Sequence, residues 1–176
     1  MTFLLKIAGK IDAVSEVAGR LVSWLTLILV AVVFGDVVMR YLFNSSFVFI
    51  QELEWHLFGV IFLMGASYTL LKDGHVRVDI FYQKMGPRFR DWVNLLGTIF
   101  FLLPGCAMII ITSSGFVQSS WSVLECSPDP GGIPCRFLLK SAIPAGFFLL
   151  ALQGVSLGIK SAAGIMGKEI GGEGKD

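Results

Sequence analysis

Five ionisable side chains lie in or beside strongly apolar segments of this chain, where charge is costly and often marks a functional site. Asp36 and Arg40 are four residues apart, and Glu52, Glu54 and His56 follow one another at a spacing of two. Carboxylates in such positions could bind a cation or a proton, and a histidine could ligate a haem iron. On a helix, Asp36 and Arg40 would share one face, so we expect them to pair.

A structural role is the better interpretation of these charged groups. Because the connection 44–49 is short, Arg40 and Glu52 should lie at similar depth and within pairing reach. The unpaired amides and the dipole at a helix N-terminus favour carboxylates such as Glu52 and Glu54. No helix interrupted by glycine or proline faces them, as a coupling-ion site usually requires. An ion or proton site formed by Asp36, Glu52 and Glu54 stays open as the alternative.

Other kinds of chemistry find less support. A haem-anchoring subunit needs two axial ligands in one bundle, but only His56 lies in an apolar segment, because His75 belongs to a hydrophilic loop. The three cysteines lack metal-ligand spacing, and the sequence has no glycine-rich phosphate-binding loop. We therefore expect no catalytic residue, no cofactor and no metal in this chain.

The composition is that of a membrane protein. Of the 176 residues, 55% are hydrophobic and only 15% are charged, and the mean hydropathy is +0.75, whereas about a quarter of the residues in soluble domains are charged. The formal net charge of +1 gives no basic field for nucleic acid. We expect contact with membrane lipid and no nucleic-acid partner.

Four apolar segments are long enough to cross a bilayer, which takes about 20 residues. They cover residues 21–43, 50–71, 92–117 and 137–159. The third belongs to an uncharged run that extends to Leu124, so it must tilt or continue along the interface, and Pro104 could kink it. The predicted fold class is an all-α membrane protein whose four transmembrane helices form one domain, 21–160.

The distribution of Lys and Arg predicts the orientation, since short cytoplasmic segments accumulate positive charge. Eleven of the fourteen lie before the first span, between the second and third, or after the fourth. Only Arg40, Arg136 and Lys140 fall on the opposite side. Both termini and the 72–91 loop are therefore expected in the cytoplasm.

Two terminal segments flank the spans. In residues 1–20, apolar side chains recur at helical spacing among polar ones, which predicts an amphipathic interfacial helix on the cytoplasmic face. No small-residue cleavage site follows, so we expect the first helix to be retained. Residues 161–176 become rich in glycine and charge and are expected to form a flexible tail.

The connection before the fourth span has three prolines and two glycines within residues 127–134, which fix turns and give a rigid, exposed surface. Cys126 and Cys135 flank this loop on the oxidising side, so a disulfide between them is possible. Cys106 lies in an apolar run and is expected to be a buried small side chain.

Three sequence patches resemble the small membrane subunit of tripartite ATP-independent periplasmic (TRAP) transporters, the DctQ-like proteins. One is Arg-Tyr-Leu-Phe-Asn at 40–44 with Glu52 beyond it. Another, the most specific, is Gly-His-Val-Arg-Val-Asp at 74–79. The last is Asp-Pro-Gly-Gly-Ile-Pro at 129–134, followed by Arg136. Together the patches extend from the first predicted span to the fourth.

The chain departs from the family pattern at two positions. Gln51 stands where the family has the first carboxylate of a Glu-Glu pair, so Glu52 and Glu54 alone would carry any role of that pair. Cys135 stands where the family often has an aromatic residue, which leaves the disulfide without family support.

The resemblance implies a complex of three proteins. A periplasmic solute-binding protein would capture the substrate, usually an organic acid, and a large membrane subunit would transport it with sodium coupling. This chain would scaffold the large subunit in the bacterial inner membrane and help to dock the binding protein. A self-sufficient small exporter and, less favoured, a haem-anchoring subunit stay open as alternative functions.

The resemblance also implies roles for particular residues. Those expected in subunit packing or at the interface with the large subunit are Asp36, Arg40, Tyr41, Asn44, Glu52, Glu54, His75 and Asp79. Those expected to dock the binding protein are Ser127, Asp129, Pro130, Gly131, Gly132 and Arg136.

Overall fold

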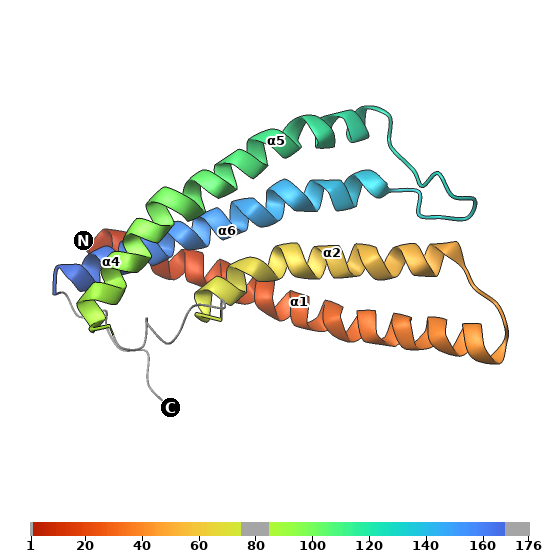
Figure 1. Cartoon of the computed structure of the whole chain (residues 1–176), viewed down its shortest axis with the longest axis horizontal. Helices are drawn as coiled ribbons and strands as arrows, with labels where there is room; N and C mark the ends of the chain where they lie inside the picture. The colour runs from red at the N-terminus through yellow and green to blue at the C-terminus, as the bar shows by residue number, and fades with distance from the viewer. Residues whose placement is uncertain (1, 75–84, 168–176) are drawn as a thin grey trace.

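The computed structural model describes residues 2–74 and 85–167, and within them it contains helices and no strand. His75 and Asp79 lie outside the described residues. The helices, labelled in Figure 1, are α1 (Thr2–Leu42), α2 (Val48–Leu71), α4 (Pro87–Gly97), the π-helical segment η1 (Thr98–Leu102), α5 (Leu103–Ser122) and α6 (Arg136–Ile165).

Four helical stretches are long and apolar enough to cross a membrane, which confirms the predicted fold class. They are Thr2–Leu42, Val48–Leu71, the combined α4, η1 and α5 stretch Pro87–Ser122, and Arg136–Ile165. Each contains the corresponding predicted span to within a residue at its ends, and all four begin before it. The orientation across the membrane stays a prediction.

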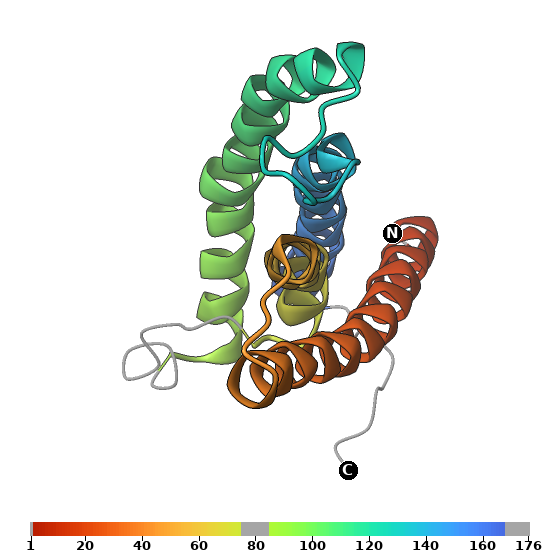
Figure 2. The same ribbon diagram turned by 90° about the vertical axis from the view of Figure 1, so that its right-hand side faces the viewer.

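The helix α6 is the centre of the bundle, because every other helix of the described chain packs on it. Figure 2 shows α6 between α5 and α2, with α1 on the far side of α2. The connections 43–47 and 123–135 lie together at one end, which we call the hairpin end (Figure 1). The start of α1 and the end of α6 lie at the opposite, terminus end.

The predicted interfacial helix 1–20 and the first span form one continuous helix, α1. Figure 2 shows that α1 curves along its length, so its first half crosses α6 and its second half runs beside α2. A Cβ added to Gly19 would overlap the ring of Tyr68 in α2. The absence of a side chain at Gly19 therefore allows α1 and α2 to approach closely where the two halves meet.

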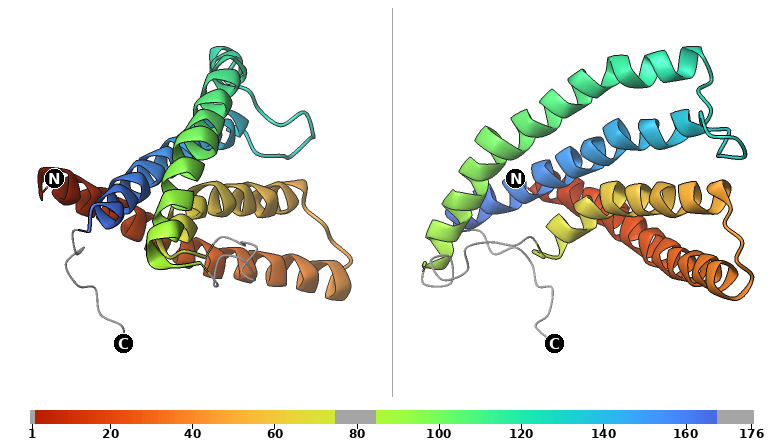
Figure 3. Two further views of the ribbon diagram at one scale, coloured as in Figure 1. Left: turned by 60° about the vertical axis from the view of Figure 1, so that its left-hand side comes forward. Right: turned by 45° about the vertical axis from the view of Figure 1, so that its right-hand side comes forward.

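The third span contains a local π-helix immediately before Pro104. Proline lacks an N–H and its ring clashes with the carbonyl four residues earlier, and a π-helical turn is one way to accommodate both. In Figure 3 the rod formed by α4, η1 and α5 curves over α6. The distortion expected at Pro104 is thus a wider helical turn on its N-terminal side.

The fourth helix continues to Ile165, so residues 161–165 are helical and do not belong to the tail predicted from residue 161. Gly167 ends this segment with a φ of 68°, a left-handed conformation that glycine adopts without strain.

Small and polar side chains fill the interior of the bundle. The completely buried side chains include Ser15, Ser67 and Ser156, whereas large apolar side chains such as Phe101 face outward. Membrane helices show this pattern, since small residues let the backbones approach closely. At Gly146 of α6 a Cβ would lie 2.7 Å from the backbone carbonyl oxygen of Leu63. Cys106 is buried, as predicted.

Candidate functional site

The buried carboxylate of Glu52 organises the hairpin end. Glu52 lies in the first turns of α2, and 5% of its surface is exposed. Its Oε1 accepts a hydrogen bond from the Ser127 hydroxyl at 2.6 Å, and its Oε2 accepts one from the Ile133 backbone N–H at 2.6 Å. Both donors belong to the connection between α5 and α6, so Glu52 fixes this loop on α2.

Backbone hydrogen bonds complete the shape of the loop. The N–H of Ser127 donates to the carbonyl of Ile133, and the N–H of Arg136 donates to the carbonyl of Glu125. Gly132 is packed so closely that a Cβ would lie 2.6 Å from Glu52 Oε2. The loop is therefore closed on its inner side, while Pro128, Asp129, Pro130 and Gly131 remain exposed at its tip.

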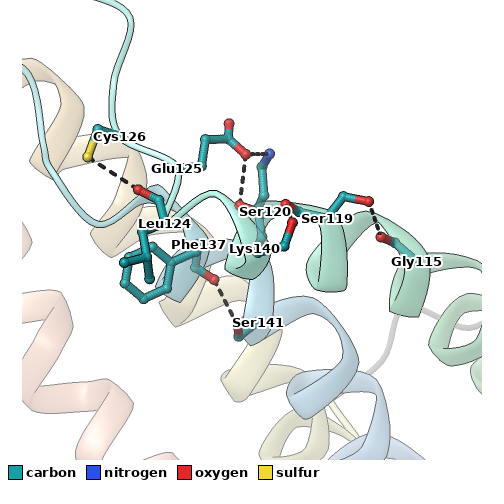
Figure 4. A network of polar contacts seen from close by, with 10 residues as sticks. Gly115, Ser119, Ser120, Leu124, Glu125, Cys126, Phe137, Lys140 and Ser141 are labelled. Carbon is teal, nitrogen blue, oxygen red and sulfur yellow. Dashed lines mark hydrogen bonds and ion pairs between the residues drawn. The ribbon is translucent and has the colours of Figure 1, made fainter.

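A second carboxylate joins the same loop to α5 and α6. Figure 4 shows Glu125 between Ser120 and Lys140, which both donate hydrogen bonds to its Oε2. These bonds, the one from Lys140 first, lower the pKa of Glu125 below its ordinary value. Trp121 Nε1 also donates to the Ser141 hydroxyl at 2.6 Å.

Arg136 lies next to the carboxylates of Glu52 and Glu125. Its guanidinium carbon lies 5.3 Å from the centre of the Trp55 ring in α2, a cation–π distance. Its positive charge contributes to lowering the pKa of Glu125.

The residues predicted to dock the binding protein have different positions in the loop. Ser127 and Gly132 lie on the inner side of the loop, and Asp129 lies at the exposed tip.

The structure contains one predicted ion pair and not another. Arg40 pairs with Asp36 one turn earlier on α1, as the spacing predicted, and the Asp36 side chain is 2% exposed. The pair considered between Arg40 and Glu52 is not formed, because Glu52 turns instead toward Ser127 and the loop. The short 43–47 connection brings the two helices to the same end, but α6 and its loop cover the face of α2 that carries Glu52.

Three buried side-chain atoms near this end have no hydrogen-bond partner within the part of the chain that the structure describes. They are Asp36 Oδ1, Glu54 Oε1 and His56 Nε2. The other ring nitrogen of His56 lies 2.6 Å from the Glu52 backbone carbonyl. An unpaired buried polar atom is costly, so these three atoms reduce the stability of this end of the bundle.

The remaining residues of the first resembling patch have distinct positions. Tyr41 is 78% exposed at the end of α1. Asn44 has a φ of 50°, a left-handed conformation that asparagine tolerates better than most residues. The N–H of Ser45 donates back to the carbonyl of Met39. Asn44 therefore ends α1 and turns the chain toward α2.

Cys126 and Cys135 are both free thiols, so the disulfide considered from the sequence is not formed in the structure. The Cys126 thiol donates to the carbonyl of Pro134 instead, with a sulfur to oxygen distance of 2.8 Å. The loop is closed by this contact and by its backbone hydrogen bonds.

A polar network at the terminus end was not predicted. Asp12 of α1 pairs with Lys160 of α6 at 2.5 Å, and its other oxygen accepts hydrogen bonds from Ser156 and Gln153. The Ser15 hydroxyl donates to Gln153 Oε1 at 2.7 Å. The only signal in the sequence was the helical spacing of Gln153, Ser156 and Lys160, which places them on one face of α6.

The site has the chemistry of an interaction surface. Within the described residues, no group of three or more His, Cys, Asp and Glu side chains is arranged to hold a metal ion. At the hairpin end, the carboxylates of Glu52 and Glu125 accept hydrogen bonds that fix a loop whose tip is exposed. What remains available is that tip, together with apolar helix faces.

Comparison with known proteins decides the family. A family model described as the DctQ component of tripartite ATP-independent periplasmic transporters matches residues 29–162. The chain belongs to the DctQ family. The match begins before Asp36 and ends after Lys160, so it includes the hairpin end and most of the α6 network. The protein is therefore the small subunit of a TRAP transporter, and it is grouped with transport proteins.

A curated relative agrees with this DctQ assignment. A protein of Haemophilus influenzae, provisionally named a TRAP transporter small permease protein, is 26% identical over 120 residues. The match covers 68% of this chain and 72% of the relative.

Proposed function

We propose that this DctQ chain is a rigid scaffold for the large membrane subunit of a sodium-coupled TRAP transporter. The complex would use a periplasmic solute-binding protein and take up an organic acid across the bacterial inner membrane. Sodium and substrate would bind in the other two proteins. In alternating access one body moves against another, so a fixed partner has a clear mechanical use.

The observation that carries this proposal is that polar contacts fasten the bundle at both ends. Asp12, Gln153 and Lys160 join α1 to α6 at the terminus end. Glu52 and Glu125 join α2, α5 and α6 through the loop at the hairpin end. Between these ends the outward faces are apolar, which suits packing against lipid and another membrane protein.

The exposed tip of the 126–135 loop is the proposed docking surface for the binding protein. Its position follows from the predicted orientation, in which the hairpin end faces the periplasm. Glu52 holds the loop in one conformation before binding, so less conformational entropy is lost on docking. The carboxylate of Asp129 at the tip would give the contact a charge preference.

The end of α1 is the proposed contact with the large subunit. The exposed side chains at this end include Tyr41, Leu42 and Phe43. Aromatic and aliphatic side chains exposed in this way would pack against a helix of the large subunit.

The experiment is purification of the tagged chain from native membranes in mild detergent, with mass spectrometry of the proteins that accompany it. We expect one large polytopic membrane protein at near-equal stoichiometry. The variant Tyr41→Ala should reduce this recovery while the chain keeps its unfolding temperature, since the side chain makes no contact that folding needs. Trp24→Ala, which removes another exposed aromatic side chain from α1, is the matched control.

Recovery of the chain alone would count against the scaffold. Transport by the purified chain without any partner would instead support the self-sufficient exporter.

A further inference from the structure

An apolar groove runs along α6 between α2 and α5 at the hairpin end. It encloses about 450 Å³ and is floored by Leu139 and Ile143 of α6. Its walls come from Gly59 and Leu63 of α2 and from Phe116 of α5. The groove exists because α2 and α5 both pack on α6 but lie on different sides of it (Figure 2).

A second, separate cavity lies farther along the bundle. This smaller cavity along the seam of α2 and α6 shares Leu63 with the groove and adds Phe62, Ala66, Phe147 and Leu150. All of these side chains are apolar. This cavity holds only about 30 Å³, and α2 and α6 approach closely at Gly146, so an apolar chain would have to lie in the groove itself.

The mouth of the groove carries two cations, Arg136 and Lys140. Lys140 is paired with Glu125 and lies over the ring of Phe116, 4.1 Å from its centre. Arg136 lies over Trp55, and within the described residues no carboxylate is within ion-pair distance of its guanidinium. The residues that line the groove include two cations and one carboxylate, which leaves one positive charge; Glu52, which also interacts electrostatically with Arg136, lies outside this lining.

The depth of this charge matches the headgroup layer of a bilayer. The 30 residues of α6 extend about 45 Å, and the hydrocarbon core is about 30 Å thick. Arg136 is the first residue of the helix and Lys140 follows one turn later. Both cations thus lie at the level where lipid phosphates lie, with the apolar groove directed toward the hydrocarbon.

We propose that this groove binds one anionic phospholipid of the leaflet at the hairpin end, with its phosphate on Arg136 and Lys140 and one acyl chain along Leu63 and Ile143. The guanidinium presents several N–H donors to phosphate oxygens. The single positive charge matches a lipid with one phosphodiester charge and no other, such as phosphatidylglycerol. This site does not depend on the proposed transporter function.

The test is native mass spectrometry of the full-length chain in detergent, titrated with phosphatidylglycerol or phosphatidylcholine. We expect one phosphatidylglycerol to be retained in preference to phosphatidylcholine. Arg136→Gln should weaken its binding about tenfold, the usual order for losing charge-assisted hydrogen bonds. Arg20→Gln, which removes an exposed cation of α1 at a distance from the groove, should leave binding unchanged.

A second variant tests the acyl-chain part of the groove. Ile143→Trp should fill the floor and reduce retention of phosphatidylglycerol, and an unchanged unfolding temperature would show that the bundle is intact. Inorganic phosphate at the same concentration should not compete, since it lacks the acyl chain. Equal binding of the two lipids, or equal retention by wild type and Arg136→Gln, would overturn the proposal. So would absence of the lipid from the complex purified with the large subunit, because a protein helix would then occupy the groove.

Discussion

The Glu52 carboxylate and the Ser127 hydroxyl are 2.6 Å apart although 75 positions separate them in the chain. This hydrogen bond joins the start of α2 to the loop before α6. The other oxygen of the Glu52 carboxylate accepts a hydrogen bond from the N–H of Ile133, so both oxygens accept from the same loop. This buried carboxylate is therefore one of the groups that hold the conformation of the loop.

Removing that carboxylate should release the loop. Glu52→Ala removes both carboxylate oxygens, so the Ser127 hydroxyl and the Ile133 N–H both lose their acceptor. We expect faster amide hydrogen exchange at Ile133 and a lower unfolding temperature. Exchange unchanged from wild type would mean that the loop holds its shape by its backbone bonds alone. Gln51→Glu, on a residue exposed beside it, is the control.

Docking of the binding protein should depend on the tip of the loop. Asp129→Lys reverses an exposed charge and should weaken binding-protein affinity roughly fivefold, as expected for about 1 kcal/mol at an exposed ionic contact. Affinity is measured with the complex in nanodiscs. Arg88→Glu changes an exposed charge at the start of α4 and should have no effect. Wild-type affinity for Asp129→Lys would remove the tip from the docking surface.

Helix packing should be sensitive to one glycine. In Gly146→Ala the new Cβ would lie 2.7 Å from the backbone oxygen of Leu63, which cannot rotate away as a side chain would. We expect a loss of about 1 to 3 kcal/mol in the free energy of unfolding. Gly105→Ala is the matched control, because a Cβ there meets no atom within 4 Å. Equal unfolding curves for both variants would contradict the close approach of α2 and α6.

The contact between α1 and α6 should be energetically coupled. A double-mutant cycle with Asp12→Ala and Lys160→Ala removes each partner of a half-buried ion pair. The coupling energy should be about 1 kcal/mol, so the double variant is less destabilised than the two single losses added together. The free energy of unfolding in detergent is measured for the wild type, the two single variants and the double variant. Strict additivity would show that the pair contributes nothing to holding the helices together.

Acid should weaken the hairpin end through Glu125. Its hydrogen bonds from Lys140 and Ser120 lower its pKa in the folded state below the ordinary value of 4.5. The stabilisation from this group is therefore complete above the ordinary pKa and is lost as the pH falls through the lowered folded value. The unfolding temperature measured across that acid range should fall less steeply in Glu125→Gln than in wild type. An equally steep fall of the unfolding temperature in wild type and Glu125→Gln would exclude this carboxyl group as a source of the acid sensitivity.

Local features of the chain were predictable because they depend on near neighbours in sequence. The four spans follow from runs of apolar residues that only helices can carry through a bilayer. The pair of Asp36 and Arg40 follows from their spacing of one helical turn. The exposed loop tip follows from proline and glycine in residues 127–134, which restrict the backbone wherever the loop lies.

Contacts between distant parts of the chain were decided by the tertiary structure alone. The sequence suggested Arg40 as a partner for Glu52, because the two are close along the chain, but α6 packs on α2 and brings Ser127 to the carboxylate instead. Asp12 belonged to the polar face of a predicted surface helix, yet it is paired in the bundle with Lys160. Helical periodicity shows which residues share a face, whereas the helix that covers this face depends on how all four helices pack together.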